Sequence, residues 1–79
     1  NNKAGDKPMN VVCYAERPDG YNGQTVQVLI TLDDGKLYEN HRHGRHLSPV
    51  LDGYLFDNIE TALWYVKRKS EFYSSVQEC

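Results

Sequence analysis

The sequence predicts an α+β fold in which a small antiparallel sheet of three to four strands packs on one C-terminal helix. Short runs rich in β-branched and aromatic residues fill the first half of the chain, with turn-forming residues between them. One stretch with apolar residues at helical spacing lies near the C-terminus. The 79 residues suffice for one domain, and a hydrophobic content of 39% is too high for a disordered chain.

The domain is expected to span residues 9–79, preceded by a flexible polar tail at residues 1–8. Residues 10–16 (NVVCYAE) combine β-branched and aromatic side chains, which favours a first strand. Pro18 and Gly20 follow it, and both favour a turn. The first strand is therefore expected to end at about residue 16.

The clearest strand is expected at residues 24–32, where apolar side chains alternate at Val26, Val28, Ile30 and Leu32. Residues 33–36 (DDGK) are typical of a tight hairpin turn. The chain should then return through residues 37–43 as a third strand.

Two registers are open for this hairpin. A two-residue loop pairs Leu32 with Leu37 and puts Glu39 on the apolar face. A three-residue loop with a bulge pairs Ile30 with Tyr38 and sends Glu39 to the other face. We predict the second register, because it buries Tyr38 and avoids burying a carboxylate without a partner.

A loop is expected at residues 46–53, followed by a short edge strand at residues 54–56 (YLF). Asp57 is the expected helix cap, and Glu60 completes a capping-box pattern three residues later. The helix should continue to about residues 74–75. Its buried stripe is predicted to contain Ile59, Ala62, Leu63, Val66 and Tyr73. Tyr65, Phe72 and Val76 would flank that stripe and widen the buried face.

The two cysteines, Cys13 and Cys79, allow a single internal disulfide. This bridge would close almost the whole chain into one loop, and the chain-entropy model assigns such a loop roughly 4 kcal/mol. The alternative is a pair of thiols in a reducing compartment. The spacing of the cysteines does not favour a metal site.

The composition of the chain limits its binding partners and its location in or outside the cell. The formal net charge of −2 gives no global field that would attract nucleic acid, so any such contact needs a local basic patch. Apolar runs are too short for a membrane span. The chain begins at Asn1 rather than Met, which fits either natural secretion or deliberate trimming, so secretion stays open.

The segment from Tyr38 to His46 (YENHRHGRH) is the first candidate site, because it holds three histidines and two arginines. Arg42, His43 and Arg45 are its candidate binding residues, and they suit phosphate contacts through a local basic patch. Two histidines with the nearby Glu39 could also supply the acid and base for RNA cleavage. Metal binding by the histidine pair lacks a third ligand in the segment, so no metal is expected. The remaining interpretation is a solvated strand end.

Trp64 is the second candidate site. On a helical wheel it falls away from the buried stripe and shares its side with Arg68 and Glu71. Trp and Arg are enriched at binding hot spots, and Arg68 lies one turn on, where it could stack on the indole. The alternative is that Trp64 packs at the edge of the core. Six tyrosines add amphipathic contact area, which is typical of interfaces.

Two short segments resemble known families. Pro49–Gly53 followed by Asp57–Leu63 resembles the strand-to-helix passage of HicB-type antitoxins, although it needs a gap and lacks the glycine before the helix. Val12–Tyr14 with Val26–Leu29 resembles the first hairpin of small secreted fungal effectors of the MAX type, whose all-β pattern a helix does not fit. Both resemblances imply a protein that acts by binding.

The sequence contains no P-loop lysine and no nucleophile elbow, and no cofactor is expected. The leading hypothesis is a small non-enzymatic binding module that contacts another protein, of the effector or inhibitor type. The alternative is a nucleic-acid-binding protein or small ribonuclease that uses the HRHGRH segment. The partner and the oligomeric state are left undetermined by the sequence.

Overall fold

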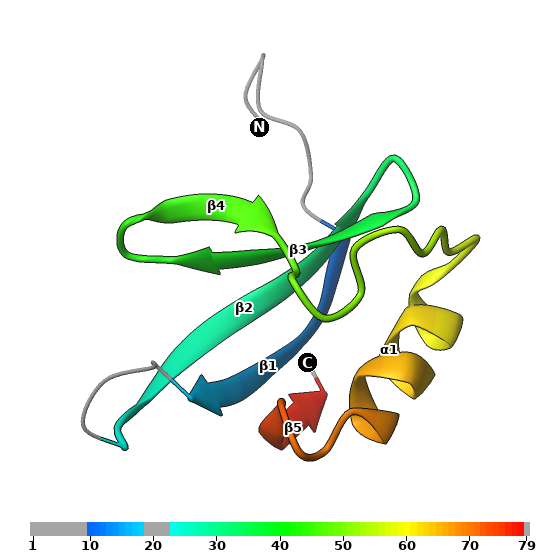
Figure 1. Ribbon diagram of the computed structural model, residues 1–79. Coiled ribbons are helices and arrows are strands. Elements are labelled where there is room, and N and C mark those ends of the chain that lie inside the picture. The colour runs from blue at the N-terminus through cyan, green and yellow to red at the C-terminus, as the bar shows by residue number, and fades with distance from the viewer. Residues whose placement is uncertain (1–9, 19–22, 79) are drawn as a thin grey trace.

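The computed structural model describes residues 10–18 and 23–78, which form five strands and one helix (Figure 1). The elements are β1 (Asn10–Pro18), β2 (Thr25–Asp33), β3 (Lys36–His41), β4 (Gly44–Leu47), α1 (Ile59–Arg68) and β5 (Ser74–Glu78). All neighbouring strands run antiparallel, in the order β4-β3-β2-β1-β5. The predicted α+β class is therefore confirmed, with more strands than expected. The predicted tail at residues 1–8 lies outside the described residues.

The core lies between one face of the sheet and α1. Within the described residues, its buried hydrophobic side chains are Val12, Cys13, Ala15, Val28, Ile30, Leu32, Leu37, Leu51, Phe56, Ala62, Val66 and Tyr73. Val12 and Cys13 are adjacent and both buried, because the register of β1 against β2 shifts between Val11 and Cys13. Such a bulge inserts one extra residue, so the alternation of faces is broken at that point.

The β2–β3 hairpin takes the register that the sequence analysis rejected. Leu32 pairs with Leu37, and Ile30 pairs with Glu39. The turn is Asp34-Gly35, with φ of 53° and 78°, and positive φ at both positions is the backbone of a type I′ turn. The preference for a bulged loop was wrong because it assumed that Glu39 would be buried alone.

β3 ends at His41, before the expected end at about residue 43, and residues 44–47 form a strand whose last two residues fall in the expected loop at residues 46–53; the expected strand at residues 54–56 is absent. Gly44 pairs with His41 across a two-residue turn and has φ of 127°, a conformation that glycine tolerates. The backbone N–H of Phe56 instead donates to the carbonyl of Gly35 at 2.8 Å, so residues 54–56 pack against the β2–β3 turn.

The helix is shorter than predicted at both ends. Its N-cap is Asn58 rather than Asp57, and the Asn58 side chain accepts a hydrogen bond from the N–H of Thr61 at 2.8 Å. The helix ends at Arg68, and the chain then turns back to form β5 beside β1. Tyr73 is buried as predicted, but it reaches the core from the turn before β5 and not from the helix.

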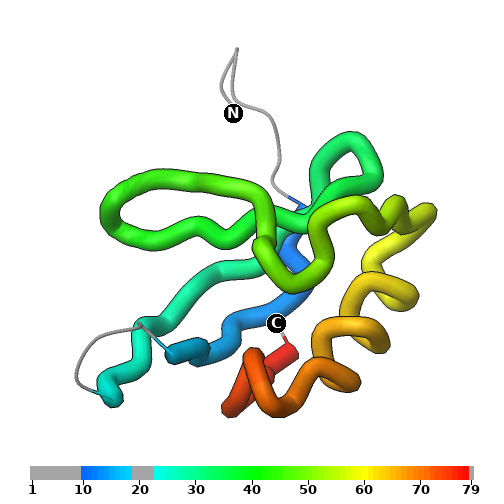
Figure 2. Tube along the Cα trace, in the orientation of Figure 1, coloured from blue at the N-terminus to red at the C-terminus, as the bar shows by residue number. Residues whose placement is uncertain are grey.

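The helix covers only part of the sheet. Figures 1 and 2 show α1 beside β1 and β5, while the β3–β4 hairpin extends away from it on the other side of the molecule. The segment between β4 and α1 passes across the sheet between these two regions (Figure 2). The core face of β3 therefore continues past the apolar core into a region that the helix does not cover. In the described part of the chain, no helix is long and apolar enough to cross a membrane.

Candidate functional site

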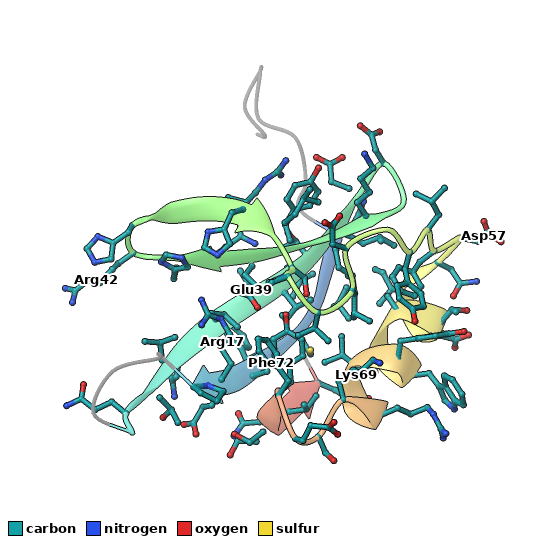
Figure 3. The ribbon with its side chains drawn as sticks, viewed as in Figure 1. Arg17, Glu39, Arg42, Asp57, Lys69 and Phe72 are labelled. Atoms are coloured by element: carbon teal, nitrogen blue, oxygen red, sulfur yellow. The ribbon has the colours of Figure 1, made fainter. Side chains whose placement is uncertain are left out.

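A buried carboxylate is the centre of the polar region beyond the core. Glu39 is 0% exposed and lies on the core face of β3, opposite Ile30. Its Oε1 accepts a hydrogen bond from Arg17 Nε at 2.7 Å, and Oε2 accepts one from the Tyr73 hydroxyl. Figure 3 shows Arg17 and Glu39 close together near the middle of the sheet. A carboxylate buried with charged and polar partners of this kind avoids most of the desolvation penalty of a lone charge.

Tyr73 joins this carboxylate to the loop after β4. Its hydroxyl donates to Glu39 and lies 2.6 Å from Ser48 Oγ, which in turn accepts from the N–H of Leu51. Burial, together with the hydrogen bond to Glu39, raises the pKa of Tyr73 above its ordinary value. The phenol therefore stays protonated and keeps its donor role throughout the physiological pH range.

Three histidines follow one another along the exposed side of this network. His46 places Nε2 at 3.4 Å from Glu39 Oε1, and its side chain is 47% exposed. The ring of His41 lies 4.9 Å from that of His46 and 6.1 Å from that of His43, measured between centroids. Because Nε2 of His46 faces the carboxylate, Nδ1 is the nitrogen left to meet another partner.

His41 carries an unusual buried atom. Its Nδ1 accepts a hydrogen bond from the backbone N–H of His43 at 3.3 Å, so Nε2 holds the proton of the neutral ring. Nε2 is buried and has no hydrogen-bond partner among the described residues. A buried donor left without a partner costs about 1–3 kcal/mol, which makes this atom a candidate for a ligand contact.

A hollow of about 460 Å³ opens beside these histidines, lined by Arg17, Val26, Gln27, His41, Arg42 and His43. Two of the residues predicted to bind, Arg42 and His43, therefore lie at one site. Arg45 does not join them. It projects from β4 to the other face of the sheet, where its guanidinium lies 3.9 Å over the Tyr38 ring and 3.3 Å from Asp33 Oδ2. The alternation of faces along β4 separates Arg45 from His46.

This geometry bears on two chemical roles that were considered for the segment, namely acid–base catalysis by Glu39 and metal binding. Glu39 is completely buried, so a substrate hydroxyl cannot reach it and it cannot act directly as an acid or base. Among residues 10–18 and 23–78, no group of three or more histidine, cysteine or acidic side chains is arranged to hold a metal ion. The chemistry open to the hollow is hydrogen bonding from imidazole and guanidinium groups.

Trp64 lies on a different surface. It is 53% exposed, as the helical wheel predicted, and the Arg68 guanidinium lies 4.6 Å over its ring. Glu71 is also exposed, but the helix ends before it, so it does not continue the line of Trp64 and Arg68. Of the three candidate contact residues on this side, Trp64 and Arg68 therefore lie on the helix and Glu71 lies in the turn that follows it.

The exposed indole is one end of a series of aromatic contacts. The Trp64 ring lies 5.1 Å from Tyr65, the Tyr65 ring 5.6 Å from Tyr54, and the Tyr54 ring 6.0 Å from Phe56. Tyr54 is exposed, and Leu55 beside it is 73% exposed. We call Tyr54, Leu55, Trp64, Tyr65 and Arg68 the aromatic surface. Its apolar residues bring together the segment before the helix and the helix itself.

Sequence reasoning missed several residues of both sites. Arg17, Ser48 and Tyr73 were not linked to Glu39, because they lie far apart in the sequence and meet only in the folded chain. Tyr54 and Leu55 were assigned to a strand, although the Asp52-Gly53 turn next to them is a signal for an irregular segment.

The predicted disulfide falls partly outside the described residues, because Cys79 is not among them. Cys13 is completely buried in β1, and its register partner in β5 is Glu78, the residue before Cys79 in the sequence. The bridge therefore stays a prediction. Comparisons with protein-family models, with curated proteins and with solved structures found no match to this chain.

Proposed function

We propose that the chain is a small binding module that contacts another protein through the aromatic surface. The observation that carries this proposal is the exposed Trp64, held between the Tyr65 ring at 5.1 Å and the Arg68 guanidinium at 4.6 Å. A tryptophan restrained by its neighbours loses little conformational entropy on binding, which favours its use as an anchor.

The surroundings of Trp64 match the organisation of protein interfaces. Leu63 lines the same groove as the indole, and Tyr54 and Leu55 are further large exposed hydrophobic side chains in the segment before the helix. Charged side chains border the indole, since Glu60, Lys67 and Glu78 line the shallow groove beside it. An apolar centre with a charged rim is typical of interfaces between proteins, where the centre supplies affinity and the rim excludes water.

The test is affinity capture of partners by the immobilised full chain, with quantitative comparison of variants. Trp64→Ala and Arg68→Ala should each lose the captured partner, because truncation of a hot-spot residue costs about 2 kcal/mol or more of binding. The thermal midpoint of both variants should stay close to that of the wild type, since both side chains are exposed.

The matched control is Tyr14→Ala. Tyr14 is 52% exposed, almost the same as Trp64, but it projects from β1 and lies away from the aromatic surface. The proposal requires proteins that the wild type and Tyr14→Ala retain and that Trp64→Ala loses. If Trp64→Ala retains every captured protein, the aromatic surface is not the contact site. If Trp64→Ala unfolds, the same comparison with Arg68→Ala decides, because Arg68 is exposed and stacks on the indole.

A further inference from the structure

The hollow beside the β3–β4 turn is separate from the aromatic surface. Figure 3 shows Arg42 at the tip of the β3–β4 hairpin and Asp57, just before α1, on the opposite side of the molecule. We propose that this hollow binds the phosphate group of a phosphate ester, such as a nucleotide or the end of an RNA strand. This proposal does not depend on the protein contact proposed above.

Two guanidinium groups at the hollow differ in how they are held. Arg17 donates Nε to Glu39 and Nη1 to the carbonyl of Pro18 at 2.9 Å, so its position is fixed before any ligand arrives. Arg42 is exposed at the turn and makes no ion pair with another described residue. One guanidinium held in place and one without an ion pair, at the same hollow, suit a phosphate, because guanidinium donors match the spacing of phosphate oxygens.

The histidines supply the remaining donors. His41 and His43 both line the hollow, and His41 Nε2 is the buried donor that lacks a partner in the described part of the chain. The χ2 angle of histidine has a broad energy minimum, so a rotation of the ring can turn Nε2 toward an acceptor in the hollow. A phosphate oxygen at that place would accept the hydrogen bond that the protein itself leaves unmade.

The charge and size of the hollow favour a phosphate ester over a cation. The described residues that line the hollow include no carboxylate, and Arg42 carries a positive charge that no ion pair with a described residue offsets, so the hollow repels a metal ion and attracts an anion. The volume of about 460 Å³ falls within the range of small-molecule sites, so it has room for more than an inorganic anion.

The experiment is a titration of the full chain at constant ionic strength, followed through the imidazole NMR signals of its histidines. The ligands are inorganic phosphate, adenosine monophosphate, a short single-stranded RNA with a terminal phosphate, and adenosine without phosphate. We expect the signals of His41 and His43 to shift and saturate with the phosphate-bearing ligands, and to stay unchanged with adenosine. Tighter binding of the esters than of inorganic phosphate identifies an ester as the ligand, and the two ester arms separate a nucleotide from an RNA.

Arg42→Ala and Arg45→Ala form a matched pair of variants. Both remove one exposed arginine from the same short segment, but Arg42 lines the hollow and Arg45 lies on the other face of the sheet. We expect Arg42→Ala to weaken binding of the phosphate ester about tenfold, the loss of one charge-assisted hydrogen bond, and Arg45→Ala to leave it unchanged. Two results overturn the proposal: no saturable shift with any phosphate-bearing ligand, or equal weakening by both variants, which shows unspecific attraction to positive charge.

Discussion

Glu39 shows how one residue connects the core to the polar region of the sheet. Burial of an isolated carboxylate costs several kcal/mol. The type I′ hairpin places Glu39 on the core face, so this register is stable only because other side chains hydrogen-bond to the carboxylate. Arg17 from β1 and Tyr73 from the turn before β5 both reach the carboxylate, and His46 lies beside it from β4. Four segments of the chain thus meet at one side chain.

Glu39→Ala should lower the free energy of unfolding by about 3 kcal/mol, near the lower end for breaking a buried pair, because Arg17 keeps some contact with water. Urea denaturation measures the difference. Glu78→Ala, which removes the exposed partner of Lys67, is the control and should cost less than about 1 kcal/mol. Losses of similar size in the two variants would mean that burial of Glu39 has no special energetic role.

Tyr73 should make stability depend on alkaline pH. Its pKa is raised in the folded chain, mainly by burial, whereas the unfolded chain titrates near the ordinary tyrosine value of about 10. The contribution is fully present below pH about 10 and decreases at higher pH, because the unfolded state then releases a proton that the folded state retains. Tyrosinate absorbance in an alkaline titration should show one tyrosine that ionises after the exposed ones, and this late step should be absent in Tyr73→Phe.

At the scale of the elements, the β2–β3 turn connects the hairpin to the segment that precedes α1. Gly35 has φ of 78°, and a Cβ at this position would lie 3.4 Å from the carbonyl oxygen of Phe56. The carbonyl of Gly35 also accepts the N–H of Phe56. The turn therefore sets the register of the hairpin and anchors the segment that carries Tyr54 and Leu55.

Gly35→Ala and Gly53→Ala should each destabilise the protein by about 1–2 kcal/mol, as measured by thermal unfolding, because both glycines have positive φ. A Cβ at Gly35 would lie in ordinary van der Waals contact with the carbonyl oxygen of Phe56, and a Cβ at Gly53 would meet nothing within 4 Å, so crowding adds little at either position. A much larger loss for Gly35→Ala would show that the contact with Phe56 adds to the cost of the backbone conformation.

Asp57 and Asn58 are adjacent candidates for the N-cap of α1, and the structure assigns this role to Asn58. Asn58→Ala should cost about 1 kcal/mol of stability, because Asn58 accepts the hydrogen bond from Thr61. Asp57→Ala should cost less, since Asp57 precedes the cap and makes no such bond. Urea denaturation of the two variants decides between them, and a larger loss for Asp57→Ala would restore the cap that the sequence pattern favoured.

At the scale of the whole molecule, the predicted disulfide would tie the last residue to the central part of the sheet. The intact protein should be about 2 Da lighter without reductant than with it, because a disulfide lacks two hydrogens. Reduction should then lower stability by roughly 4 kcal/mol on the chain-entropy model. Equal masses under the two conditions would show two thiols instead.

Sequence patterns predicted the elements whose signals are local. The alternation in β2, the strand expected at residues 10–16 and the apolar spacing at Ala62 and Val66 each reflect one element packing on one core. β5 was not predicted, because its sequence SSVQE has no clear alternation and becomes a strand by pairing with β1. The local spacing placed Trp64 away from the buried stripe but left a position at the edge of the core open, and it gave no indication of the contacts of Glu39.

The sequence by itself determined the α+β class, the alternating strand that contributes Val28, Ile30 and Leu32 to the core, and the helix near the C-terminus, because these depend on the periodicity of neighbouring residues. Only the tertiary structure decided the hairpin register, the end of the helix and the polar site around Glu39. Each of these depends on groups distant in the sequence. Burial of the Glu39 carboxylate was expected to cost too much free energy. It is stable in the interior because Arg17 and Tyr73 both hydrogen-bond to it.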